Sequence, residues 1–148
     1  MGSYYCHEVT EICPGLFVSG YRDVARMVQM GADVLVPLDS LSGGIWDTGF
    51  RGEILYCPIT DYGVLPDDVL EKLVGDIIKR LDDGKRLGMF CIGGHGRTGY
   101  VAACVLKRRG IKNPIAYLHT HYCRNAVESN EQRTAILAFP KQQPEIAD

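Results

Sequence analysis

The sequence lacks any long hydrophobic run. No apolar segment approaches the roughly 18 residues that a membrane-spanning helix requires, so no membrane span is expected. The N-terminal residues also lack the basic region and the apolar stretch of a secretory signal. Together, these absences predict a cytoplasmic protein.

The sequence also lacks an excess of charge of either sign. Its 148 residues include 16 Lys and Arg and 18 Asp and Glu, which gives a formal net charge of −2. This balance provides no electrostatic reason to expect nucleic acid or an anionic membrane as a partner. Internal repeats, low-complexity tracts and Pro/Ser-rich linkers are absent, so residues 1–148 are predicted to form a single domain.

Cysteine is present in an even number, which would allow disulfides. Because no secretory signal accompanies the six cysteines, we expect reduced thiols instead. One of them, Cys57, has two interpretations. It is either a small side chain of the core, or it forms a disulfide with another of the six, Cys91, under oxidation and so protects the Cys91 thiol. The others are Cys6, Cys13, Cys104 and Cys123.

Apolar runs alternate with segments of helical spacing along the chain. Such alternation predicts the α/β class, with a short, mostly parallel central sheet flanked by helices. Residues 39–52, which include Trp46, have the glycine content of a surface loop. Strands are predicted at 16–19, 33–38, 53–59 and 87–91, and helices at 21–30, 66–83, 99–109, 114–122 and 129–139.

One segment carries a recognisable chemistry. Five residues separate Cys91 from Arg97, between a predicted buried strand and a predicted helix. The backbone N–H groups of such a loop and the positive end of the helix together form an anion site of phosphate size. Three glycines permit the positive φ angles that this loop is expected to need. The predicted phosphate-binding residues are Ile92, Gly93, Gly94, His95, Gly96 and Arg97.

The side chains of this segment have distinct expected roles. Arg97 offers a planar fork that grips two phosphate oxygens. The helix end and the guanidinium favour the thiolate of Cys91, which is an effective nucleophile toward phosphorus. Thr98 is expected to hydrogen-bond the sulfur and to ease its departure. His95 is either a loop residue without a role or a source of positive charge.

Other interpretations of the same residues are weaker. The spacing of Gly94, Gly96 and Gly99 also matches the dinucleotide fingerprint, but no further predicted strand carries the acidic residue that holds a ribose. Cys91 alone would be an ordinary buried cysteine, were it not for the spacing to Arg97. The residues His119, His121 and Cys123 suggest a metal cluster, but on a helix His121 points away from the other two. No metal and no organic cofactor are expected.

The Cys-x5-Arg sequence followed by Thr98 and Gly99 resembles the signature of the cysteine-based protein tyrosine phosphatases, especially their dual-specificity branch. The chain departs from that pattern at Phe90, where the family usually has His. The resemblance extends over nearly the whole chain. Residues 13–20 resemble the opening strand of the family, and residues 34–38 resemble its second buried strand. Residues 58–61 with Pro66 resemble its acid loop, and Arg124 with residues 128–132 resembles the segment that orients water and braces the phosphate loop.

The resemblance implies a general acid and a water-positioning residue. Asp61 is the predicted acid, because it follows a predicted buried strand and begins a loop that ends at Pro66. Asp67 and Asp68 compete for this role, but they also suit the first turn of the next helix. Gln132 is the residue expected to position water.

The resemblance also implies the substrates. We expect phosphotyrosine proteins, with phosphoserine and phosphothreonine as further targets, or small phosphate monoesters. The alternatives are phosphoinositides, inositol phosphates, RNA 5′ phosphates, or a catalytically weak module that binds phosphoproteins. A sulfurtransferase or an arsenate reductase also uses a cysteine loop, but neither chemistry needs Asp61. The sequence makes no prediction about the oligomeric state.

Overall fold

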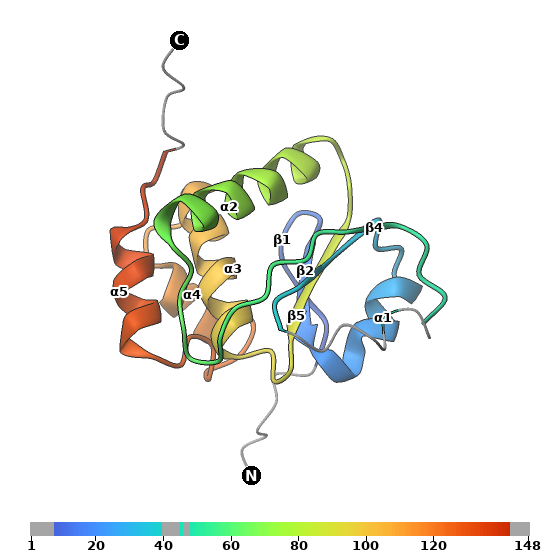
Figure 1. Ribbon diagram of the computed structural model, residues 1–148, viewed down its shortest axis with the longest axis horizontal. Coiled ribbons are helices and arrows are strands. Elements are labelled where there is room, and N and C mark those ends of the chain that lie inside the picture. The colour runs from blue at the N-terminus through green and yellow to red at the C-terminus, as the bar shows by residue number, and fades with distance from the viewer. Residues whose placement is uncertain (1–7, 40–44, 46–47, 143–148) are drawn as a thin grey trace.

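Five strands form one sheet in the computed structural model, which describes residues 8–39, 45 and 48–142 (Figure 1). Cys6 and Trp46 lie outside these residues. The strand order is β1-β2-β5-β3-β4. The β1–β2 pair is antiparallel and the other three pairs are parallel. The strands are β1 (Thr10–Cys13), β2 (Leu16–Gly20), β3 (Val34–Pro37), β4 (Glu53–Ile54) and β5 (Leu87–Cys91).

Helices cover both faces of this sheet. Figure 1 shows α1 on one face, with α2 to α5 on the other. The predicted α/β class with a mostly parallel sheet is therefore confirmed. The helices are the short 3-10 turn η1 (Tyr21–Asp23), α1 (Val24–Gln29), α2 (Asp67–Asp82), α3 (Gly96–Arg108), α4 (Pro114–His121) and α5 (Asn130–Ala138).

One strand was not predicted, and the boundaries of several elements differ from the prediction. Strand β1 was not predicted, because its four residues have no alternating or continuous apolar pattern. Strand β4 ends at Ile54, although backbone bonds from the amides of Leu55 and Cys57 to β3 carbonyls keep the following segment beside the sheet. Helix α3 begins at Gly96, three residues before the predicted start, so Arg97 already belongs to its first turn.

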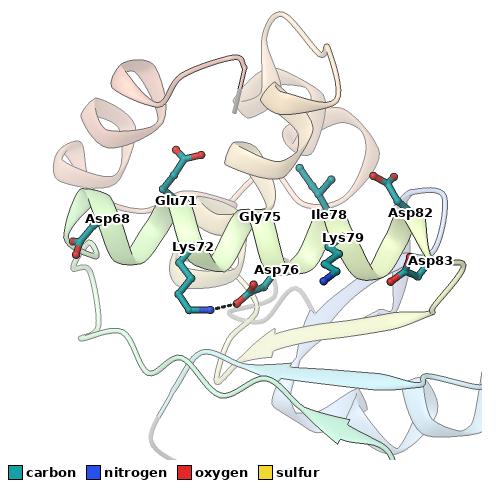
Figure 2. A pocket seen from close by; sticks show the side chains of 9 residues that line it. All are labelled: Asp68, Glu71, Lys72, Gly75, Asp76, Ile78, Lys79, Asp82 and Asp83. Atoms are coloured by element: carbon teal, nitrogen blue, oxygen red, sulfur yellow. Dashed lines mark hydrogen bonds and ion pairs between the residues drawn. The ribbon is translucent and has the colours of Figure 1, made fainter. Parts of the chain in front are cut away.

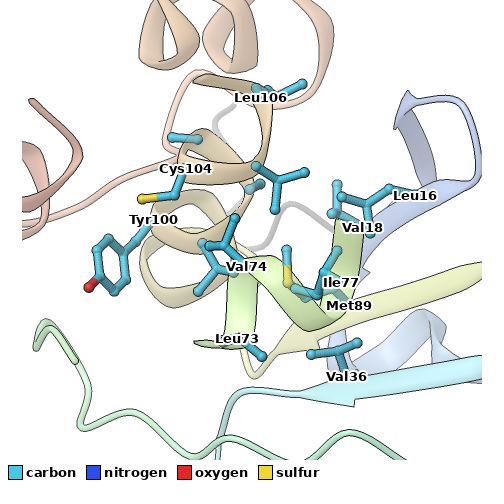
Figure 3. Close-up of a cluster of buried hydrophobic side chains, with 14 of the residues drawn as sticks. Leu16, Val18, Val36, Leu73, Val74, Ile77, Met89, Tyr100, Cys104 and Leu106 are labelled. Atoms are coloured by element: carbon cyan, nitrogen blue, oxygen red, sulfur yellow. The ribbon is translucent and has the colours of Figure 1, made fainter. Parts of the chain in front are cut away.

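Side-chain alternation along β5 divides the core between the two faces of the sheet. Leu87, Met89 and Cys91 face α2 and α3 and belong to the larger hydrophobic cluster. Figure 3 shows Met89 of this cluster packed with Val74 and Ile77 from α2. Phe90 belongs to the second cluster, on the α1 face, and is fully buried. The nucleophile candidate and the residue before it therefore point into different layers.

Helix α2 is amphipathic and covers the larger cluster with its apolar side. Asp67 and Asp68 occupy its first turn, where the helix dipole favours negative charge. Its solvent side borders a shallow groove of about 690 Å³, lined by α2 side chains and by Asp83 (Figure 2). Lys72 and Asp76 form an ion pair there at 2.8 Å. This charged, solvated face includes Asp68, one of the competing acid candidates, but not Cys91, Arg97 or Asp61.

The thiols are not all reduced. Cys13, Cys57, Cys91 and Cys104 are free, but Cys123 is disulfide-bonded. The expectation of reduced thiols throughout is therefore wrong for Cys123. That expectation was based on the absence of a secretory signal. The compartment inferred in this way does not determine which cysteines the fold brings close together. None of the helices in the described ranges is long and apolar enough to cross a bilayer.

Candidate active site

The segment from Cys91 to Arg97, here called the phosphate loop, joins the end of β5 to the start of α3. Cys91 is the last residue of the central strand and is only 2% exposed. The hydroxyl of Thr98, in the first turn of α3, donates a hydrogen bond to the Cys91 Sγ at 3.0 Å. The sulfur thus lies beside a helix N-terminus and next to a hydroxyl donor, and both stabilise negative charge.

Carbonyl groups of the phosphate loop are held by the surrounding protein. In a planar trans peptide the N–H points opposite to the C=O, so a bound carbonyl fixes the direction of the next amide. The bound carbonyls therefore orient the amides of Gly93, His95 and Gly96. The bonds run from Tyr21 N–H to the Ile92 carbonyl (3.2 Å), from the Tyr122 hydroxyl to Gly94 (2.8 Å), and from the Gly99 and Val127 amides to His95 (2.8 and 3.2 Å).

The glycines of the loop serve different purposes. Gly94 alone of the three has a positive φ, at 75°. Gly96 instead permits close approach, because a Cβ there would lie 2.6 Å from the Glu128 Oε1. The expectation that all three glycines are needed for positive φ angles is therefore wrong, since packing accounts for Gly96.

Glu128 brings a carboxylate directly to the phosphate loop. Its Oε1 accepts a hydrogen bond from the Gly96 amide at 2.9 Å. An anionic group thus already binds one amide of the loop, which is the behaviour expected of an anion site. The sequence indicated Glu128 only as part of the segment 128–132.

Arg97 is buried against the loop and is only partly satisfied. Its Nη1 donates to the Ile59 carbonyl at 3.2 Å, and its Nη2 lies 3.8 Å from the Asp61 Oδ1. The Nε is buried and has no hydrogen-bond partner within the part of the chain that the structure describes. Buried donors in proteins are almost always satisfied, so this nitrogen is suited to an oxygen of a bound anion.

Asp61 opens the acid loop, defined here as residues 61–65. Its side chain is 59% exposed, and the contact with Arg97 places it beside the phosphate loop. Asp67 and Asp68, the competing candidates, lie in the first turn of α2. The structure therefore brings Asp61 to the site and accounts for the other two as helix-terminal charges.

The acid loop is attached to the helices beside it. Tyr62 has a positive φ of 62°, and its carbonyl accepts a hydrogen bond from the Ser129 hydroxyl at 2.8 Å. The Gly63 carbonyl accepts from the Gln132 side chain at 3.2 Å, and the Leu65 amide donates to the Tyr100 hydroxyl at 3.2 Å. These bonds fix the loop against α3 and the start of α5.

Gln132 is fully buried at the start of α5. Its Oε1 accepts from the amides of Glu128 (3.0 Å) and Ser129 (3.3 Å), while its Nε2 donates to Gly63. With Ser129 it forms a capping box at the helix N-terminus. Both the oxygen and the nitrogen of the side-chain amide are therefore bonded to backbone groups. That Gln132 positions a water molecule stays a prediction.

The remaining candidates have structural partners. His95 is 7% exposed and its Nδ1 lies 3.7 Å from the Cys123 Sγ, which favours a packing role. His119 contacts the Ala126 carbonyl at 2.8 Å, and His121 stacks on Tyr117 at 4.0 Å. Within the described ranges, no three His, Cys, Asp or Glu side chains are placed to hold a metal ion.

Cys57 lies on the far side of β3 from Cys91. Its amide donates to the Pro37 carbonyl, whereas Phe90 and Cys91 belong to the strand on the other side of β3. Two inter-strand spacings separate such positions by about 9–10 Å. This exceeds the roughly 7 Å that a disulfide allows between Cα atoms. Burial raises the pKa of the Cys57 thiol, which further lowers its reactivity.

Known proteins resemble this chain in sequence and in fold. Residues 22–145 match the family model described as PTP-SAK, Swiss Army Knife protein, DSP-PTPase phosphatase domain. The uncharacterized protein MJ0215 of Methanocaldococcus jannaschii is 41% identical over 87 residues, which are 59% of this chain and 55% of that protein. The chain therefore spans little more than half the length of this relative.

Solved structures resemble most of the chain. Tk-PTP in its active form superimposes with a TM-score of 0.74 at 24% identity, covering 87% of this chain and 92% of that one. PTPMT1 in complex with PI(5)P gives a TM-score of 0.71 at 14% identity, covering 88% and 93%. At these identities the likeness establishes the fold.

Proposed function

The chain belongs to the PTP-SAK family of DSP-PTPase phosphatase domains, and we propose that it hydrolyses phosphate monoesters with Cys91 as nucleophile and Arg97 as phosphate ligand. One observation carries this proposal: the buried Arg97 Nε has no hydrogen-bond partner among the described residues, and Arg97 lies with Cys91 at the N-terminus of α3. An equatorial phosphate oxygen would satisfy that donor.

The first step transfers the phosphoryl group to sulfur. The Cys91 thiolate attacks phosphorus, and the bond from phosphorus to the ester oxygen breaks as the S–P bond forms. Arg97 and the loop amides stabilise the charge on the equatorial oxygens. Asp61 gives its proton to the leaving oxygen, which departs as the alcohol or phenol.

The second step returns the enzyme to its starting state. Water attacks the cysteinyl phosphate, Asp61 accepts a proton from this water, and the S–P bond breaks to release inorganic phosphate. The Thr98 hydroxyl, 3.0 Å from the sulfur, stabilises the departing thiolate. No metal or organic cofactor takes part in this scheme.

Phosphotyrosine is the substrate that we infer first, with phosphoserine and phosphothreonine as further substrates. Ile92 follows the nucleophile and is 42% exposed, while Tyr62 follows the acid and is 56% exposed. Exposed apolar surface beside both reacting groups suits an aromatic ester. The phosphate loop itself carries only His95 and Arg97 as basic residues, and this favours substrates with a single phosphate.

Two alternatives remain for comparison. PTPMT1, which shares the fold, was solved with PI(5)P, so a phosphoinositide is the second substrate class to assay. A module that only binds phosphoproteins is the non-enzymatic alternative. The retention of Cys91, Arg97 and Asp61 in one site favours catalysis over binding alone.

Hydrolysis of para-nitrophenyl phosphate tests the proposal. The wild-type protein and Cys91→Ser are compared from pH 5 to 8 with EDTA present. We expect turnover in the wild type and none in the variant, because serine is a far weaker nucleophile at these pH values. Equal activity in both proteins contradicts the role of Cys91. Inactivity of both, with phosphopeptide binding retained, favours the binding module.

A further inference from the structure

Tyr122 contacts the phosphate loop from a position that no sequence motif indicates. It follows the last residue of α4, and its hydroxyl donates a hydrogen bond to the Gly94 carbonyl at 2.8 Å. The side chain is partly buried and packs against the larger hydrophobic cluster. The bond therefore reaches the loop from the protein interior.

This bond determines the direction of one amide. The peptide between Gly94 and His95 is trans, so its N–H points opposite to the carbonyl that Tyr122 holds. A carbonyl directed at the protein interior aims the His95 N–H toward the open side of the loop. That is the side from which a phosphate group has to enter.

The local sequence does not determine this direction by itself. Gly93 and Gly94 have no side chains, and Gly94 has a positive φ of 75°. Glycine pairs allow several peptide orientations at similar energy. Phe90, which stands where the family has His, carries no hydrogen-bond donor and packs on the α1 face. An external donor such as Tyr122 is therefore needed to select one orientation.

The hydroxyl of Tyr122 stays protonated at neutral pH. Burial raises its pKa, and the negative charges of Cys91 and Asp23 raise it further. The hydroxyl is therefore a permanent donor to the Gly94 carbonyl.

We propose that Tyr122 is a positioning residue that holds the Gly94 carbonyl and thereby directs the His95 N–H at the substrate phosphate. This inference rests on the proposed function, because it requires phosphate to occupy the loop. Tyr122 itself does not touch the substrate. Its hydroxyl sets the geometry of a group that does.

The test removes one hydroxyl and keeps the ring. Tyr122→Phe is compared with Tyr117→Phe, because the hydroxyl of Tyr117, within the helix that Tyr122 follows, donates to the Ile12 carbonyl at 3.2 Å and not to the loop. Inhibition by inorganic phosphate and the rate of Cys91 alkylation against pH are measured for both. We expect about tenfold weaker phosphate inhibition in Tyr122→Phe, the usual effect of losing one hydrogen bond to a charged group.

The expected pattern also includes alkylation. In Tyr122→Phe the pH midpoint of Cys91 alkylation should rise, because a misdirected amide stabilises the thiolate less. Tyr117→Phe should match the wild type in both phosphate inhibition and alkylation. Wild-type phosphate inhibition and alkylation in folded Tyr122→Phe overturn the inference and leave the proposed function intact. An inactive wild type, by contrast, contradicts the proposed function itself.

A measurement on the wild type covers the case in which Tyr122→Phe does not fold. The His95 amide proton is followed by NMR during titration with inorganic phosphate. A downfield shift that saturates supports the orientation inferred for this amide, because hydrogen bonding to an anion deshields the proton. Saturable phosphate binding that leaves the His95 amide unshifted overturns the inference.

Discussion

Two carboxylates border the phosphate loop, and they contact different parts of it. The Asp61 Oδ1 lies 3.8 Å from the Arg97 Nη2, whereas the Glu128 Oε1 already accepts from the Gly96 amide at 2.9 Å. Asp61 is more than half exposed and has no amide of the phosphate loop bound to it in the described structure. Its freedom to approach a leaving oxygen favours it as the proton donor.

Replacement of these two residues distinguishes them. We predict that Asp61→Asn lowers turnover of phosphotyrosine about 100-fold, the usual contribution of general acid catalysis. The decline of rate on the alkaline side of the pH optimum should also disappear, because it reports deprotonation of the acid. Glu128→Gln is the matched variant and should keep that decline. The opposite result in a pH–rate series would assign the proton to Glu128.

Residue-level prediction succeeded where chemistry fixes a spacing. The interval between Cys91 and Arg97 indicated a loop at a helix start, and the structure has one. Tyr122 was missed, because a tyrosine that reaches a loop from another helix leaves no local pattern. Glu128 was indicated only within a longer segment for the same reason.

At the scale of elements, the start of α5 connects both loops of the site. Gln132 bonds the acid loop through Gly63 and also receives the amide of Glu128, whose carboxylate contacts the phosphate loop. Such a continuous set of bonds restricts the distance between Asp61 and Cys91, the proposed general acid and nucleophile. This geometry is a condition for proton transfer in the transition state.

We predict that Gln132→Glu lowers turnover by about tenfold, because a carboxylate keeps the acceptor but replaces the donor to the Gly63 carbonyl with a repulsive oxygen. The effect should vanish in an Asp61→Asn background, since the bond acts through the acid loop. Gln29→Glu, on exposed α1 surface, is the control. Stopped-flow kinetics measures the formation and the breakdown of the cysteinyl phosphate separately. If Gln132→Glu slows only the breakdown, the result supports the water-positioning role instead.

Prediction of the elements depended on how strongly each was buried. β5 and β3 are central, so continuous apolar runs marked them within a residue or two. β1 and β4 lie at the edges. β1 left too little trace in hydrophobicity to be predicted, whereas β4 was predicted with the right start and beyond its end at Ile54. The early start of α3 escaped prediction because Gly96 is a poor helix former that is placed there by its contact with Glu128.

At the scale of the whole molecule, the ion pair between Glu53 and Arg80 joins the edge strand β4 to helix α2. Arg80 bonds Glu53 through both carboxylate oxygens, at 2.8 and 2.5 Å. The hydrogen bond from Arg80 lowers the pKa of Glu53. A lowered pKa adds stability that is present above the unfolded value of about 4.3 and is lost as the pH falls through the folded value.

We predict that Glu53→Gln destabilises the protein at pH 7 by less than about 1 kcal/mol, the range for exposed pairs. The difference from wild type should shrink as the pH approaches 3, because the carboxylate is then protonated in both states. Urea unfolding at several pH values measures this. Asp76→Asn removes a pair internal to α2 and serves as the control. A difference that is constant with pH contradicts the linkage.

The Nε of Arg97, which has no partner in the described part of the chain, has a consequence for stability. A buried donor without an acceptor raises the free energy of the folded state, and a bound oxyanion removes that penalty. A local energetic cost at a binding site is expected of a trade-off between stability and activity. Inorganic phosphate, the product of the proposed reaction, should therefore raise the thermal unfolding temperature as well as inhibit.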